Sequence, residues 1–172
     1  GIMLNIHQKY CRETFYDGKL VGFDPVYHEN FNFAYDVVDA IAQAEPLRRA
    51  MLWCNESGEE HTFTFSDISK ASNRAANFFA SLGIGRGDRV MLILKRHYQF
   101  WFALLGLHKL GAVGIPATNQ LTKKDISYRC NAAGVKAVIC TTDGGVTEHV
   151  ESALPDSPTV KIKISVHGQY ND

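Results

Sequence analysis

The sequence predicts an α/β fold: a mostly parallel, doubly wound sheet with flanking helices, an N-terminal arm and a β-hairpin. The first reason is the order of the elements along the chain. After residue 66, segments with helical spacing alternate with short apolar segments, as in proteins with parallel sheets. The second is that residues 90–94 are apolar without interruption, as in a strand covered on both faces. The third is size, because 172 residues can bury about 70% of the unfolded surface without a metal or a disulfide.

Residues 1–30 are expected to form an irregular arm. Gly18, Gly22 and Pro25 interrupt any regular pattern there. The arm carries aromatic side chains that we expect to hold it against a folded body: Tyr10, Phe15, Tyr16, Phe23 and Tyr27. Residues 31–172 are then expected to form the α/β part of the molecule.

Before the sheet, the pattern predicts a helix, a hairpin and a second helix. Apolar residues recur at helical spacing up to Pro46, which ends the first helix. Residues 50–54 and 61–65 are predicted strands, and the short polar turn between them predicts a β-hairpin. The second helix is expected to have Ser66 as its N-cap and Gly83 as its C-cap.

From residue 90 onward, strands alternate with helices. Strands are predicted at residues 90–94, 112–115, 137–140 and 160–166, and helices at residues 97–110, 122–133 and 146–154. We expect the first three of these strands to be parallel neighbours, because crossover connections between parallel strands are right-handed. The earlier hairpin, with its Met51 and Phe63 strands, should pair antiparallel beside this sheet.

The composition excludes several classes of protein. The 18 Lys and Arg residues match 18 Asp and Glu residues, which argues against a nucleic-acid binder and against a polybasic membrane-surface protein. No apolar segment approaches the roughly 20 residues of a membrane span, and residues 1–10 hold no apolar signal core, so we expect a cytoplasmic protein. The four cysteines form no CxxC pair and are expected to be free, mostly buried thiols: Cys11, Cys54, Cys130 and Cys140.

No short motif predicts an active site by itself. Residues 83–88 (GIGRGD) follow a helix and precede a strand, the reverse of a phosphate-binding loop. Residues 141–145 (TTDGG) lie between a strand and a helix, where backbone amides can bind an anion, but no lysine accompanies them. His97 and His108 lie about three helical turns apart, too far to share a metal ion. We therefore assign no catalytic and no metal-binding residue, and the cofactor-binding residues stay unknown.

The sequence does indicate where a ligand would bind. In open parallel sheets, ligands lie outside the carboxyl ends of the strands. Here that edge consists of residues 95–96, 116–119 and 141–143. We expect substrate-side contacts there, with Thr118 and Asn119 as the residues to substitute first, and assign no specific role to any side chain.

Two longer stretches resemble the adenylate-forming (AMP-binding) superfamily. The first comprises residues 63–68 (FTFSDI), 73–76 (NRAA) and 82–90 (LGIGRGDRV). The second is residues 107–122 (LHKLGAVGIPATNQLT). Within the superfamily, residues 31–39 (FNFAYDVVD) and 120–129 (QLTKKDISYR) resemble acetyl-CoA and medium-chain acyl-CoA synthetases.

This resemblance implies a ligase of fatty acid metabolism. Such an enzyme activates a carboxylate with ATP and Mg²⁺ to an acyl-adenylate, releases pyrophosphate and passes the acyl group to CoA. The family's Ser/Thr/Gly-rich phosphate loop, its adenine and ribose motifs and its lid with the adenylation lysine do not occur in these 172 residues. The chain is therefore expected to be an N-terminal piece of a longer enzyme, inactive alone and without a bound cofactor.

The expected partners follow from the same resemblance. They are the remainder of the enzyme's own chain, a carboxylic acid substrate and a second copy, since a shortened α/β chain would expose apolar surface. Two alternatives stay open: a stand-alone interaction or regulatory domain, and a small nucleotide-binding module that uses residues 141–145. A reading frame that continues past Asp172 would exclude the first, and measured ATP or AMP binding would favour the second. The preferred acyl chain length does not follow from the sequence.

Overall fold

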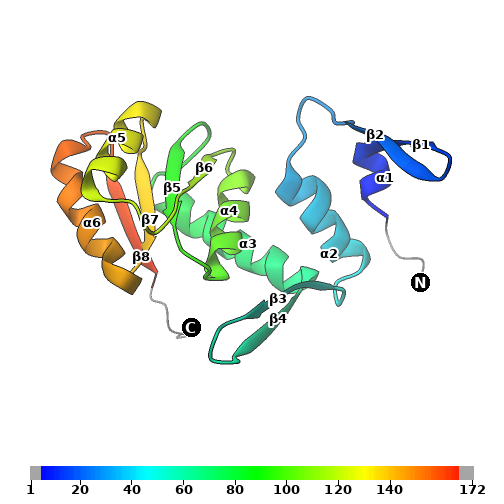
Figure 1. Ribbon diagram of the computed structural model, residues 1–172, viewed down its shortest axis with the longest axis horizontal. Coiled ribbons are helices and arrows are strands. Elements are labelled where there is room, and N and C mark those ends of the chain that lie inside the picture. The colour runs from blue at the N-terminus through cyan, green and yellow to red at the C-terminus, as the bar shows by residue number, and fades with distance from the viewer. Residues whose placement is uncertain (1–4, 167–172) are drawn as a thin grey trace. The chain divides into compact units, whose positions relative to one another are not determined.

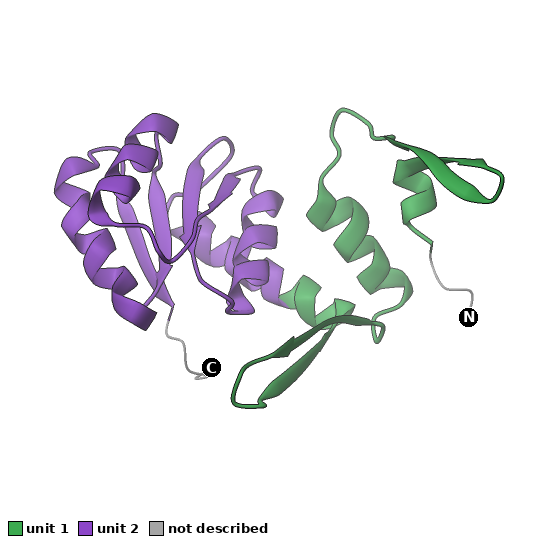
Figure 2. Ribbon diagram, viewed as in Figure 1, with its two compact units in different colours: residues 1–70 green, residues 71–172 purple. Residues whose placement is uncertain are grey.

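The computed structural model describes residues 5–166 and divides the chain into two compact units. The first unit is Gly1–Lys70 and the second is Ala71–Asp172 (Figure 2). The first contains two hairpins and a helical segment, and the second contains a parallel sheet with its helices (Figure 1). The division into an arm of residues 1–30 and an α/β part of residues 31–172 stays a prediction.

The first hairpin corrects the expectation of an irregular arm. A short helix α1 (His7–Tyr10) leads into strands β1 (Cys11–Tyr16) and β2 (Lys19–Pro25), which pair antiparallel. Between them Asp17 and Gly18 have φ angles of 48° and 71°, the left-handed pair that a tight type I′ turn requires. The prediction is wrong because it counts Gly18 as an interruption, although an Asp-Gly pair favours hairpin formation.

The helix predicted before Pro46 is confirmed, and its first part is wound as a π-helix. The π segment η1 (Phe33–Asp39) continues directly into helix α2 (Ala40–Ala44). Asn32 caps it, because its side chain accepts a hydrogen bond from the Ala34 N–H at 3.1 Å. The Asp36 carboxylate in turn accepts a hydrogen bond from the Asn32 N–H at 2.7 Å.

The second hairpin is confirmed. Strands β3 (Arg49–Cys54) and β4 (Glu60–Thr64) pair antiparallel with Met51 opposite Phe63, and they form a two-stranded sheet of their own.

The helix that follows, α3 (Phe65–Ser81), begins two residues earlier than an N-cap at Ser66 implies. Its N-terminus is capped by Thr64, whose hydroxyl accepts a hydrogen bond from the Asp67 N–H at 3.1 Å. The Asp67 carboxylate accepts one from the Thr64 N–H at 2.9 Å. The prediction that Ser66 caps this helix is therefore wrong: the Thr64–Asp67 pair satisfies the first amides reciprocally. Gly83, with a φ of 86°, ends the helical segment as predicted.

The parallel sheet of the second unit confirms the predicted fold class. Its strand order is β6-β5-β7-β8, and all three neighbouring pairs run parallel. The strands are β5 (Arg89–Ile93), β6 (Val113–Pro116), β7 (Ala137–Thr141) and β8 (Ile162–Val166). The chain first runs from β5 to β6 on one side, then crosses back over β5 to β7 and β8 on the other.

Three helices connect these strands. They are α4 (Gln99–Lys109), α5 (Lys123–Ala133) and α6 (Val146–Ala153), with the short 3-10 turns η2 (Asp143–Gly145) and η3 (Leu154–Asp156) around the last. Helix α5 has the predicted Thr122 cap, which exchanges hydrogen bonds with Asp125. Helix α4 begins at Gln99 rather than at the predicted His97, because residues 94–97 form a turn.

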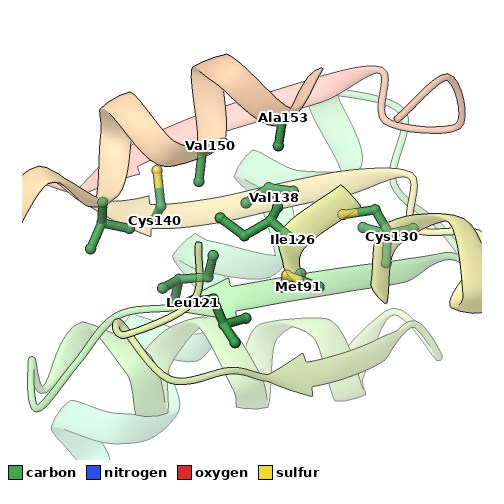
Figure 3. Packing of buried hydrophobic residues seen from close by; sticks show 11 residues of the cluster. Met91, Leu121, Ile126, Cys130, Val138, Cys140, Val150 and Ala153 are labelled. Atoms are coloured by element: carbon green, nitrogen blue, oxygen red, sulfur yellow. The ribbon is translucent and has the colours of Figure 1, made fainter. Parts of the chain in front are cut away.

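The core lies on both faces of the sheet, which explains the uninterrupted apolar strands. Met91 and Ile93 pack with α5 and α6 in one cluster, part of which Figure 3 shows. Val90, Leu92 and Leu94 alternate with them and pack with α3 and α4 in a second cluster. Helices therefore cover both faces, and the sheet is doubly wound (Figure 1).

The cysteines follow their prediction only in part. All four are free, and Cys130 and Cys140 are buried, where desolvation raises the pKa of both thiols. Cys54 is exposed and Cys11 is half-buried. Over residues 5–166, no helix combines the length and the apolar character needed to cross a bilayer.

Candidate functional site

The candidate site lies at the carboxyl edge of the parallel sheet, where the strand order reverses. The connection after β5 leads through α4 on one face, and the connection after β7 leads through α6 on the other. In doubly wound sheets, ligands bind at this switch point, because the two loops diverge there. We call residues 94–98 and 141–145 the switch-point loops.

His97 joins the two switch-point loops. Its Nε2 atom lies 2.7 Å from Oδ2 of Asp143 and 3.0 Å from Oγ1 of Thr141. The His97 side chain is 14% exposed and that of Asp143 is 38% exposed, so the pair lies at the boundary between core and solvent. A carboxylate oxygen only accepts hydrogen bonds, so we assign the ring proton to Nε2.

The backbone of the first loop holds His97 in this position. Lys95 has a φ of 53°, a left-handed conformation that few non-glycine residues adopt. The His97 N–H then donates a hydrogen bond to the Leu94 carbonyl at 3.1 Å, which closes the turn directly after β5.

The second loop is fixed by hydrogen bonds around Thr141. Thr141 is fully buried, and its hydroxyl accepts a hydrogen bond from the Asp143 N–H at 3.1 Å. Thr147 donates its hydroxyl to the Thr141 carbonyl at 3.3 Å. Gly144 and Gly145, with φ angles of 60° and 75°, then turn the chain into α6. This network fixes Asp143 opposite His97.

The predicted edge residues are brought together only in part. Residues 95–96 and 141–143 flank the switch point, as the strand order requires. Thr118 and Asn119 follow β6, which lies on the side of β5 opposite to β7. The Thr118 hydroxyl accepts a hydrogen bond from the Gln120 N–H at 3.3 Å within its own turn.

The structure also bears on the anion site considered at residues 141–145. The turn does lie between a strand and a helix, as predicted. Its one charged side chain is the carboxylate of Asp143, which would repel an anion, and the segment contains no lysine. The geometry therefore favours an ordinary strand-to-helix turn. Within residues 5–166, no group of three side chains is arranged to hold a metal ion.

Sequence reasoning missed the pairing of His97 with Asp143. It considered His97 only together with His108, which lies on α4. A usable signal was present, because His97 follows one buried strand and Asp143 follows the next but one. Only the strand order, which makes β5 and β7 neighbours, shows that these two positions meet.

Comparisons with known proteins find mitochondrial acyl-coenzyme A synthetases among the relatives of this chain. Rat mitochondrial acyl-coenzyme A synthetase ACSM5 is 38% identical over 144 residues, which cover 80% of this chain and 25% of the relative. Human mitochondrial ACSM4 is 35% identical over 147 residues, covering 82% and 25%. The chain thus spans about a quarter of the length of these curated relatives.

Solved structures agree with the sequence relatives. A fatty acyl CoA synthetase from Mycobacterium tuberculosis superposes with a TM-score of 0.70 at 25% identity, covering 78% of this chain and 26% of that one. The inhibitor-bound N-terminal domain of FACL13 from the same organism has a TM-score of 0.69 at 25% identity, covering 78% and 33%. The sequence profile of the AMP-binding enzymes matches residues 38–171, which is most of the chain. The chain therefore belongs to the AMP-binding enzyme family.

Proposed function

We propose that this chain is the N-terminal part of an acyl-CoA synthetase. The enzyme would join a carboxylic acid to AMP at the expense of ATP and then transfer the acyl group to CoA. The observation that carries the proposal is the family match over residues 38–171, with acyl-coenzyme A synthetases as the relatives. Family membership implies that ATP and CoA are the co-substrates.

The described residues do not fit ATP and Mg²⁺ by themselves. Residues 5–166 contain no strand followed by a glycine-rich loop with a lysine, and the turn at residues 141–145 presents the Asp143 carboxylate instead. Carboxylate or imidazole ligands are likewise not assembled for a metal within this range. Positioning and charge neutralisation dominate phosphoryl chemistry, so this chain alone should be catalytically incomplete.

The proposal is tested on the full-length protein that contains this chain. Purified enzyme is incubated with ATP, Mg²⁺, CoA and acetate, butyrate or octanoate, and AMP and acyl-CoA are quantified. We expect equal amounts of both products, formed only when an acid is present. A correctly folded enzyme that forms AMP with none of these acids would exclude the assignment.

The carboxyl edge of the sheet is the proposed place of substrate-side contacts in the full-length enzyme. Thr118 and Asn119 lie at the end of β6, exposed and half-buried respectively. Substituting both by alanine should change KM or kcat for the acid or for CoA. Unchanged kinetics would remove these two residues from the site.

We keep the cytoplasm as the proposed compartment. The names of the curated relatives place those proteins in mitochondria, which does not support this choice. A fluorescent fusion of the full-length protein expressed in its own cells decides the matter, and co-localisation with a mitochondrial marker would refute the cytoplasmic assignment.

A further inference from the structure

The two ring nitrogens of His97 differ, because over residues 5–166 only Nε2 is hydrogen-bonded to the protein. Both hydrogen bonds of the ring are made by Nε2, to Asp143 and to Thr141. Nδ1 makes no hydrogen bond to any residue from 5 to 166. It is also not among the buried side-chain atoms without a partner, and the side chain of His97 is 14% exposed.

This arrangement is that of an oriented base. Asp143 accepts a hydrogen bond from the Nε2–H group, which leaves the lone pair of the neutral ring on Nδ1. A carboxylate in this position also stabilises the imidazolium that forms when the other nitrogen takes up a proton. Thr141 contacts the same Nε2 atom from a fully buried position and restricts the orientation of the ring.

The loop conformation adds a second observation. Lys95 and Asp17 are the only non-glycine residues with a positive φ among residues 5–166, and Lys95 lies two positions before His97. A left-handed conformation costs a non-glycine residue on the order of 1 kcal/mol. Such a conformation persists only where the surrounding structure holds the backbone in it. Here it orients the turn that carries His97 to the switch point, where ligands of such sheets bind.

The chemistry of the proposed reaction shows what such a base would serve. At neutral pH the carboxylic acid and ATP already enter as anions and have no proton to lose. A thiol has an ordinary pKa of about 8.5, so it enters mainly protonated and must lose its proton to become a nucleophile. The same loop carries the exposed cations Lys95 and Arg96, whose positive charge favours the approach of polyanionic CoA.

We propose that His97, oriented by Asp143, accepts the proton of the CoA thiol in the thioester-forming half-reaction. The S–H bond breaks and its proton goes to Nδ1 of His97. The sulfur electron pair forms the bond to the acyl carbon, and the bond from that carbon to the AMP oxygen breaks, with AMP leaving as the phosphate anion. The imidazolium then returns its proton to solvent. This inference rests on the proposed function.

The first test separates the two half-reactions in the full-length enzyme. ATP–pyrophosphate exchange without CoA measures adenylation, and single-turnover reaction of preformed acyl-adenylate with CoA measures thioester formation. His97→Gln keeps a polar side chain but provides no base. It should leave exchange within about twofold and slow thioester formation by about 100-fold or more, the range of general-base catalysis. His149→Gln, an exposed histidine on α6, is the matched control and should change neither rate.

The outcomes are distinguishable. Thioester formation by the His97→Gln enzyme within twofold of wild type overturns the proposal, and so does an equal loss of both half-reactions, which would indicate a structural role. Absence of both activities in the wild-type enzyme would instead refute the proposed function itself.

Asp143 is the positioning residue and has its own test. Asp143→Asn retains an oxygen that can accept a hydrogen bond from the Nε2–H group, whereas Asp143→Ala does not. Thioester formation should therefore be slowed more by the alanine variant than by the asparagine variant. Equal rates for the two variants would contradict the positioning role.

A measurement on the 172-residue chain needs no activity. Histidine ¹⁵N NMR above the titration range reports which ring nitrogen carries the proton. We expect His97 in the Nε2–H form, and a dominant Nδ1–H form would overturn the proposal even if the His97→Gln variant were to misfold.

Discussion

At the scale of single residues, Asp88 and Lys136 close the turn between α3 and β5. Lys136 donates hydrogen bonds to the Asp88 carboxylate at 2.9 Å and to the Gly83 carbonyl at 2.7 Å. The Gly85 N–H donates to the same carboxylate oxygen at 2.8 Å. The hydrogen bond from Lys136, and then that from Gly85, lower the pKa of Asp88 below its usual range.

Asp88→Ala should therefore destabilise the protein. The pair is about one-third exposed, so we expect a loss of only about 1 kcal/mol in the free energy of unfolding by urea. Because the folded-state pKa is lowered, this stabilisation is present above about pH 4 and is lost as the pH falls further. Asp156→Ala, which removes a more exposed ion pair with Lys123, is the control and should change stability little. Equal effects of both variants would contradict the account.

The second prediction at this scale concerns His108 on α4, which is a base where Asp88 is an acid. Burial lowers its pKa, so the unfolded chain binds the proton more readily than the folded one. Its contribution to stability is therefore present above about pH 6.5 and is lost as the pH falls below that value. His108→Gln should flatten the decline in unfolding free energy between about pH 7 and pH 5. An unchanged decline would show that other groups cause it.

At the scale of elements, α3 and α4 pack closely because one position lacks a side chain. A Cβ atom on Gly106 would lie 2.8 Å from Cβ of Ala75 and 3.0 Å from the backbone nitrogen of Ala76. The backbone atom cannot move aside without shifting α3. Lys109, nearly buried on the same helix, donates a hydrogen bond to Asn73 of α3 at 2.7 Å and fixes the same pairing.

Gly106→Ala should destabilise the protein by about 2 kcal/mol, because overpacking outweighs the better helix propensity of alanine. Thermal or urea unfolding measures the loss. Gly85→Ala is the control, because nothing lies within 4 Å of the added Cβ and the glycine has no positive φ. A Gly106→Ala variant as stable as wild type would mean that the helices can separate at little cost.

An element can be predicted from the sequence when its burial leaves a pattern of apolar residues. Strands β5 and β7 are buried on both faces, so their apolar sequences alone identify them. The β1–β2 hairpin depends on the backbone conformation of Asp17 and Gly18, and its strands are mostly exposed, so no alternation of apolar residues marks it. The sequence favours Ser66 over Thr64 as the cap of α3 because Thr64 also belongs to strand β4.

The candidate site was less predictable than the fold. The carboxyl edge followed from the order of strands and helices. The contact of His97 with Asp143 joins residues 46 positions apart and requires β5 and β7 to be adjacent. The turn at Lys95 is also needed, and its left-handed backbone has no sequence signal in a lysine.

At the scale of the whole molecule, the second unit exposes large apolar side chains. Phe78 on α3 and Trp101 on α4 are each 50% exposed, and Val113 on β6 is 47% exposed. Strand β6 is also an edge of the sheet, with one side unpaired in the described part of the chain. Exposed apolar surface and open sheet edges favour association.

We therefore expect the isolated 172-residue chain to self-associate. Light scattering at increasing concentration should show a dimer, and Trp101→Glu should shift the equilibrium toward the monomer by placing a charge on the apolar surface. A strict monomer at high protein concentration would count against the prediction.

The central claim is that this chain is a catalytically incomplete part of an acyl-CoA synthetase, and ATP–pyrophosphate exchange tests it most directly. Exchange is measured with acetate, butyrate and octanoate for the 172-residue chain and for the full-length protein, each against a no-protein control. The account predicts acid-dependent exchange by the full-length protein and none by the 172-residue chain. Exchange by the 172-residue chain above the control, or a folded full-length protein inactive with all three acids, would contradict it.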